Sequence, residues 1–258
     1  MYKLSKNHHE LKISYLKHLL DGMPHGTFGE RQGYKVINIT YDPTDPEVSS
    51  RHKKVIRFNS PEGKVMLPII TEYQRIKNEL DYLLNQWEMT YWHEPAMIEY
   101  PLRKKRRTGL TSEFFRNAKS NANPFHPEEL KIEYKGQWFR SKNEMSAAQI
   151  IESMGYDFKS EVHVQIKGSE NEHYPDVSFD VPELDVMLMS EIDGKLDKGN
   201  YRLKSMERQY GYFEDGFREF KDIVFMRLAD PTVFDPEHYE LLVKAAIEAN
   251  IDDIIRGD

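Results

Sequence analysis

The sequence predicts an α/β fold for residues 131–258, preceded by a smaller α+β region. Two observations predict it. Apolar residues recur at helical spacing in some segments of this half, and short alternating or continuous runs of β-branched and aromatic residues lie between them. The segments follow one another in the order α-β-β-β-α-β-α, which is typical of a sheet covered by helices.

Residues 1–95 are predicted to be the α+β region. An amphipathic helix is expected over residues 9–20, and Asp21-Gly22 ends it. Residues 35–40 and 54–58 are predicted strands, and apolar residues at helical spacing predict a helix over residues 68–87. No cluster of chemically reactive residue types occurs here, so we expect this region to give support or to bind a protein partner.

Residues 96–130 are predicted to be a basic linker, because they lack a periodic apolar pattern. Between Arg103 and Lys119 this segment carries one acid, Glu113, and seven basic residues: Arg103, Lys104, Lys105, Arg106, Arg107, Arg116 and Lys119. A block of like charge is usually a solvated loop. Beside a nucleic-acid site the same block would contact phosphates.

The second half carries clear boundaries for its helices and strands. Ser141 is a predicted N-cap with Glu144 three residues later, the spacing of a capping box, and Gly155 ends that helix. Leu203, Met206, Tyr210 and Phe213 share one face of a later helix. The predicted helices span residues 140–154, 199–215 and 236–255, and the predicted strands span residues 158–166, 174–181, 184–192 and 222–228.

Composition excludes several classes of site. The chain has no cysteine, which rules out disulfides, thiol nucleophiles and cysteine-bearing zinc sites and fits a reducing cytoplasm. The ten histidines form no HExxH or paired zinc spacing, and no phosphate-binding loop is present. No apolar segment is long enough to cross a bilayer. Any metal must therefore bind to oxygen or imidazole, and oxygen ligands favour magnesium, calcium or manganese.

The two strands around Pro182-Glu183 bring acids together. If these residues form a two-residue turn, Asp176 lies across from Met189, on the same face as Glu191 and Asp193. Asp176 and Glu191 are then diagonal neighbours, about 7 Å apart by Cα, and a divalent cation would offset their repulsion. The alternative is that Asp176 is an ordinary turn residue and that Glu191 begins an exposed loop.

Three stretches of the second half resemble the PD-(D/E)XK nuclease superfamily. They are RSKNEMSAAQIIESMGYDFKSEV, YPDVSFDV and LDVMLMSEIDGKLDKGNY. The resemblance covers residues 131–230 and implies a restriction-endonuclease-like core, α-β-β-β-α-β, with a mixed sheet flanked by helices. It also implies that magnesium or manganese is bound by Asp176, Glu191 and the Ile192 carbonyl. Glu144 becomes a further acid of the metal site, a role compatible with capping the helix, whereas Glu161 is expected to be structural.

The chain departs from the family pattern at Asp193, where the family has a lysine. An aspartate can accept a proton or bind a second metal, but it supplies no positive charge. Lys204 and Arg208, one turn apart on the next predicted helix, could supply it, or they could be solvated. The same helix carries Tyr201, Tyr210 and Tyr212, whose rings could stack on bases but are more often packing residues.

The resemblance implies a metal-dependent endonuclease that hydrolyses phosphodiester bonds in DNA, within a mobile-element or phage-defence system. Glu144, Asp176, Glu191, Asp193 and Lys204 would be the catalytic residues. Arg208 and the basic block would contact nucleic acid. The alternative, motivated by Asp193, is a module of the same fold that has lost catalysis and binds nucleic acid or a protein partner.

Overall fold

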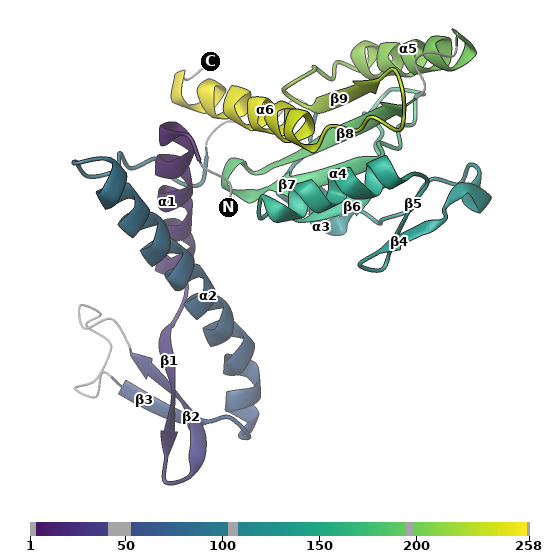
Figure 1. Cartoon of the computed structure of the whole chain (residues 1–258). Coiled ribbons are helices and arrows are strands. Elements are labelled where there is room, and N and C mark those ends of the chain that lie inside the picture. The colour runs from purple at the N-terminus through teal and green to yellow at the C-terminus, as the bar shows by residue number, and fades with distance from the viewer. Residues whose placement is uncertain (1–3, 41–52, 103–107, 195–198, 257–258) are drawn as a thin grey trace. The chain divides into compact units, whose positions relative to one another are not determined.

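The chain has a mixed α/β structure that divides into two compact units. A computed structural model describes residues 4–40, 53–102, 108–194 and 199–256 (Figure 1). Lys6–Pro101 form one unit, and the described residues from Leu102 onward belong to the other. No helix within these ranges is both long enough and apolar enough to cross a membrane.

The first unit is a three-stranded antiparallel sheet with two helices. It consists of α1 (Lys6–Asp21), β1 (His25–Arg31), β2 (Tyr34–Thr40), β3 (Lys53–Arg57) and α2 (Pro61–Thr90). The strand order is β1-β2-β3. Ile37 and Ile39 of β2, Ile56 of β3 and Ile70 of α2 form one buried cluster, so α2 packs on one face of the sheet.

Two features of this unit differ from the sequence prediction. Strand β1 was not predicted, because Pro24-His25-Gly26 has the composition of a turn and six of the seven β1 residues are exposed. Helix α2 begins at Pro61 rather than at Pro68, since the Ser60 hydroxyl accepts a hydrogen bond from the Gly63 N–H at 3.0 Å and caps an earlier turn. Pro68 then lies inside the helix.

The second unit contains the predicted α-β-β-β-α-β-α series and short elements before it. Its central sheet has the order β6-β7-β8-β9, in which β8 and β9 are parallel and the other pairs antiparallel. The elements are α3 (Ser112–Asn117), η1 (Pro127–Glu129), β4 (Ile132–Tyr134), β5 (Gln137–Phe139), α4 (Lys142–Ser153), β6 (Phe158–Ser160), β7 (Val177–Val181), η2 (Pro182–Leu184), β8 (Val186–Gly194), α5 (Gly199–Glu214), β9 (Ile223–Leu228) and α6 (Pro236–Arg256).

Helices cover both faces of the mixed sheet. Helices α4 and α6 contact each other and the sheet, and the Tyr239 hydroxyl of α6 donates to the Ser190 hydroxyl of β8 at 2.9 Å. On the other face, Met187 and Met189 of β8 pack with Phe115 of α3 and Tyr212 of α5. Because side chains alternate along a strand, Glu191 and Asp193 lie on this second face.

The register of the β7–β8 hairpin differs from the prediction by two residues. The predicted two-residue turn is wrong: the loop comprises Pro182 to Asp185, so that Val181 pairs with Val186 and Val177 with Ser190. A shift of two residues leaves every side chain on its face. Extending the register by one residue sets Asp176 directly opposite Glu191 rather than diagonal to it.

The predicted strand over residues 158–166 is also shorter than expected. Strand β6 ends at Ser160, because Glu161 has a φ of +43° and therefore cannot continue the extended conformation. Val164 still forms an isolated bridge with His173. Part of the predicted linker is ordered as well, since Leu110 and Phe115 belong to the buried cluster of this unit.

Candidate active site

Asp176 and Glu191 meet where strand β7 begins. Asp176 occupies the bend just before β7, and Glu191 lies in β8 with 1% of its surface exposed. The Ile192 backbone N–H donates to Asp176 Oδ2 at 2.7 Å, which holds the carboxyl group against β8. Glu191 is thus held inside a buried strand, and Asp176 is held at the edge of the sheet by its hydrogen bond to β8.

Glu144 completes an N-terminal cap on α4. Its backbone N–H donates to the Ser141 hydroxyl at 3.2 Å, and its Oε2 accepts from the Arg140 N–H at 2.8 Å. The predicted capping box is thus confirmed, with the carboxylate reaching back to the residue before the cap. Glu144 nevertheless lies close enough to the other acids for its charge to raise the pKa of both Asp176 and Glu191.

Burial and mutual repulsion raise the pKa of the acids at this site. Burial raises the pKa of Asp176 well above its usual value, and the charges of Glu191 and Glu144 raise it further. Burial likewise raises the pKa of Glu191, against the opposing effect of Arg208. Among the described residues, none donates a hydrogen bond to the buried Glu191 Oε2. A buried oxygen without a donor, in an acid cluster, is a suitable ligand for a cation.

Arg208 of α5 brings a positive charge to the cluster. Its Nη2 lies 2.6 Å from Asp193 Oδ1, and its Nε lies 3.5 Å from Glu191 Oε2. The nearby Glu191 is the main cause of the raised pKa of Arg208. Of the two basic residues predicted to supply charge, Lys204 is exposed and makes neither of these ion pairs.

Helix α5 turns its polar side, not its apolar stripe, toward the acids. The stripe predicted from spacing is exposed, with Leu203 60% and Tyr210 66% accessible. Tyr212 is instead fully buried, and its hydroxyl donates to Glu191 Oε1 at 2.7 Å. The sequence gives Arg208 and Tyr212 as one turn apart, a spacing that places both on one face of the helix, but it does not reveal which face packs inward.

Tyr212 is in turn held by a buried polar pair. Its ring stacks on His173, with centroids 4.2 Å apart, and His173 Nε2 lies 2.6 Å from Asp215 Oδ2. The Ser169 hydroxyl donates to the other oxygen of Asp215 at 2.6 Å. This network links the end of α5 to the segment that leads into Asp176, and sequence analysis had not singled it out.

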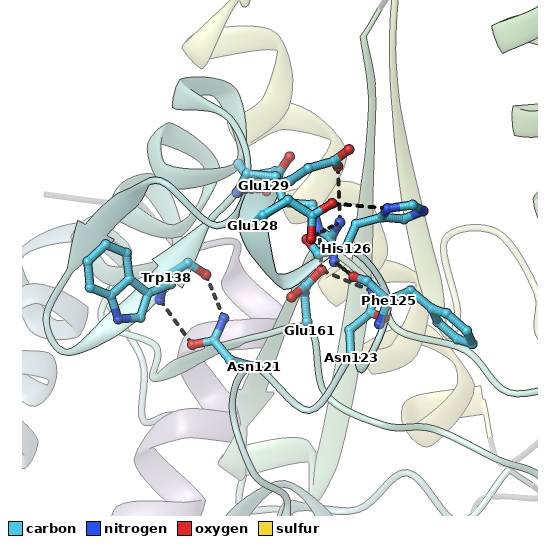
Figure 2. A network of polar contacts seen from close by, with 10 residues as sticks. Asn121, Asn123, Phe125, His126, Glu128, Glu129, Trp138 and Glu161 are labelled. Carbon is cyan, nitrogen blue, oxygen red and sulfur yellow. Dashed lines mark hydrogen bonds and ion pairs between the residues drawn. The ribbon is translucent and has the colours of Figure 1, made fainter.

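A second group of possible metal ligands lies at the surface. Among the described residues, the donor atoms of His126, Glu128 and Glu129 all lie within 4.8 Å of one another, and all three residues are exposed. The acids at the sheet do not form such a three-residue group. Figure 2 shows the surface group above Glu161, which is 97% buried and accepts from Asn123 at 3.1 Å and from Arg140 at 2.6 Å. Because Arg140 also pairs with Glu129 at 3.1 Å, these contacts give Glu161 the structural role expected of it.

The basic block is only partly described. Arg103, Lys104, Lys105, Arg106 and Arg107 lie outside the described residues. Arg116 is exposed at the end of α3, and Lys119 is exposed shortly after it.

No family model matches the chain, and no curated protein or solved structure is significantly similar to it. What the site does is therefore argued from its chemistry.

Proposed function

We propose that the chain is a magnesium- or manganese-dependent nuclease of the PD-(D/E)XK type that hydrolyses phosphodiester bonds in DNA. Residues 131–258 would form its restriction-endonuclease-like core. The observation that supports this most is the position of Asp176, one residue before β7, where the extended register sets it opposite Glu191 of β8. The Ile192 N–H fixes the Asp176 carboxyl group, and no described residue donates a hydrogen bond to Glu191 Oε2.

The acids have the chemistry that a divalent cation requires. Asp176 and Glu191 would hold the ion, together with the Ile192 carbonyl, and Glu144 would add negative charge from the helix side. Such an ion acts as a Lewis acid on a phosphate oxygen and lowers the pKa of water. Burial and repulsion between the carboxylates raise the pKa of both Asp176 and Glu191. A bound cation would offset that repulsion, because its positive charge would lie between the acids.

The remaining residues of the site would bind and orient the phosphate. Arg208 presents its guanidinium group beside Glu191, where a fixed positive charge would offset charge that develops on the phosphate. This is the task that the family assigns to the lysine replaced here by Asp193. Asp193 would orient that guanidinium group through their ion pair, and Gln209 would hold Asp193 in place by donating a hydrogen bond to it at 3.0 Å. Tyr212 would fix the Glu191 carboxylate.

A second function is a binding module of the same fold without catalysis. The ion pair of Arg208 with Asp193, 2.6 Å long, favours this binding module. The guanidinium group already offsets negative charge in the acid cluster, which is what a catalytic metal ion would otherwise do. Such a module would bind nucleic acid, or a protein partner, without cutting it. Cleavage is the property that separates the two functions.

Replacing Asp176 by asparagine tests the proposal. Asp176→Asn keeps an oxygen for the Ile192 N–H but removes the charge that a cation needs, so we expect cleavage of DNA with magnesium or manganese to be lost. Glu207→Gln, an exposed acid on α5, is the matched control and should cut at the normal rate. Circular dichroism checks that both variants fold. Cleavage by Asp176→Asn at the wild-type rate would exclude the assignment, and absence of cleavage by the wild type on any DNA, with binding retained, would select the binding module.

A further inference from the structure

Among the described residues of the first unit, no helix packs on one of the two faces of the three-stranded sheet. Ile37, Ile39 and Ile56 point toward α2, so the residues that alternate with them point away. On this open face Thr27, Arg31 and Arg57 are exposed, and Tyr34 and Val55 are 52% and 41% accessible. The face lies in a different compact unit from the acid cluster.

The charge of these strands is opposite to that of the whole chain. Arg31 and Arg57 are basic residues of the open face, and no strand residue on that face is an acid, because Glu30, Lys35 and Lys54 alternate onto the face that packs on α2. The complete chain has a net charge of −7. Among the described residues, neither Arg31 nor Arg57 forms an ion pair, and the Arg57 guanidinium group lies over the Tyr34 ring at 4.4 Å. The open face therefore suits a polyanion.

The width and chemistry of the face suit the major groove of duplex DNA. Neighbouring strands lie about 4.8 Å apart, and a major groove about 12 Å wide admits a two-stranded ribbon such as β1 and β2. Asn38 lies on the middle strand between Thr27 and Val55, and a Cβ at Gly29, its diagonal neighbour on β1, would come within 2.9 Å of its amide nitrogen. The glycine thus leaves room for that amide, a group that can pair with the edge of adenine.

We propose that this open sheet face binds duplex DNA, with β1 and β2 entering the major groove. Arg31 and Arg57 contact phosphates at its margins, and Asn38 and Thr27 reach base edges. Phosphate contacts fix the position of a protein on DNA, and base contacts read the sequence. The first unit would then be a DNA-binding unit that is separate from the acid cluster. The inference requires no cleavage, so it stands or fails independently of the proposed function.

The affinity of the full chain for a short duplex DNA, measured by fluorescence anisotropy in EDTA, tests this inference. The double variant Arg31→Ala/Arg57→Ala should bind more weakly, and its slope of log Kd against log salt concentration should fall by about 2, close to 0.9 for each lost phosphate contact. Arg75→Ala is the matched control, because Arg75 is an exposed arginine of α2 that pairs with Glu72 and Glu79. An unchanged double variant, or an equal loss in Arg75→Ala, would overturn the inference.

Two further measurements separate groove recognition from general charge attraction. Asn38→Ala should weaken binding without changing the salt slope, since it removes a base contact and no phosphate contact. Duplex RNA should compete poorly, because its deep, narrow major groove does not admit side chains. Equal competition by RNA, or full affinity in Asn38→Ala, would reject insertion into the groove.

Discussion

Arg208 is the residue on which the chemistry of the acid cluster depends most. Its guanidinium group pairs with Asp193 and lies beside Glu191, so its removal takes away the positive charge that both buried carboxylates contact among the described residues. We expect Arg208→Ala to reduce the rate of DNA cleavage by about 10²- to 10³-fold, the range seen when a group that stabilises developing charge is removed. The pKa of Glu191 should rise, which moves the pH optimum upward.

Lys204→Ala is the control for this prediction, since Lys204 is exposed one turn away on the same helix. Arg208→Lys should recover part of the activity, because it restores charge but not the two-sided geometry of a guanidinium group. The sequence prediction that Lys204 is catalytic would be supported instead if Lys204→Ala lost activity and Arg208→Ala kept it.

Asp180 is a buried acid whose ionisation should destabilise the fold. Burial raises its pKa from 3.8 to about 6, despite a hydrogen bond of 2.6 Å from the Ser112 hydroxyl. A raised pKa means that its contribution to stability is complete below about pH 4 and is lost as the pH rises through 6. Asp180→Asn should therefore raise the free energy of unfolding at about pH 8, by at most about 3 kcal/mol.

Urea denaturation at about pH 8 and about pH 4 measures this difference, which should disappear at the lower pH. Glu207→Gln is the control, because Glu207 is exposed on α5 and is not among the groups that raise the pKa of Asp180, and it should change little at either pH. A loss of stability in Asp180→Asn at both values would mean that the hydrogen bond to Ser112 requires the charged form.

Single residues of the site could be predicted where local geometry determines them. Asp176 and Glu191 follow from strand alternation, which survives a register error of two residues. Glu144 follows from the spacing of a capping box. His173 and Asp215 could not be predicted in the same way, because they lie 42 residues apart and meet only through the packing of α5.

Elements were predictable where a cap or a buried run marks them and not where tertiary contacts decide. Ser141 and Gly155 mark the ends of α4, and β8 is a continuous buried run. Strand β1 lacks such a signal, because six of its seven residues are exposed. Its one buried residue is Gly26, which packs on Ile70 and has no apolar side chain. The orientation of α5 also could not be predicted from the sequence, because it depends on contacts of Arg208 and Tyr212 with the buried acids of β8.

Helix α5 gives a prediction about its own apolar stripe. If the apolar stripe of α5 faced the core, any polar replacement in it would lower the free energy of unfolding strongly. Leu203 and Met206 of this stripe are instead 60% and 51% exposed. We expect Leu203→Gln to change the free energy of unfolding by no more than about 0.5 kcal/mol, as is usual for surface positions. Tyr212→Phe, on the buried side, removes the donor to Glu191 and should cost about 1 to 3 kcal/mol in the same thermal or urea measurement. Equal effects would mean that both sides of the helix are buried.

At the scale of the whole molecule, the two units have separate cores. Ile37, Ile39, Ile56 and Ile70 form one buried cluster of the first unit, and the mixed sheet with its helices carries a buried cluster of the second. The sequence predicted a change of character near residue 95, and the contacts divide the chain at Pro101. The proposed roles follow this division, with DNA binding in the first unit and the acid cluster in the second.

Separate cores predict two thermal transitions that respond to different substitutions. Ile37→Ala removes a fully buried side chain from the first unit, and Val224→Ala removes one from β9 of the second. Deleting buried methyl groups costs the affected core about 2 to 4 kcal/mol for isoleucine and less for valine. We therefore expect Ile37→Ala to lower one transition in differential scanning calorimetry, together with duplex binding, and Val224→Ala to lower only the other. If the whole chain unfolded in one two-state transition, both variants would shift that single transition equally. Such a result would contradict the division into two units.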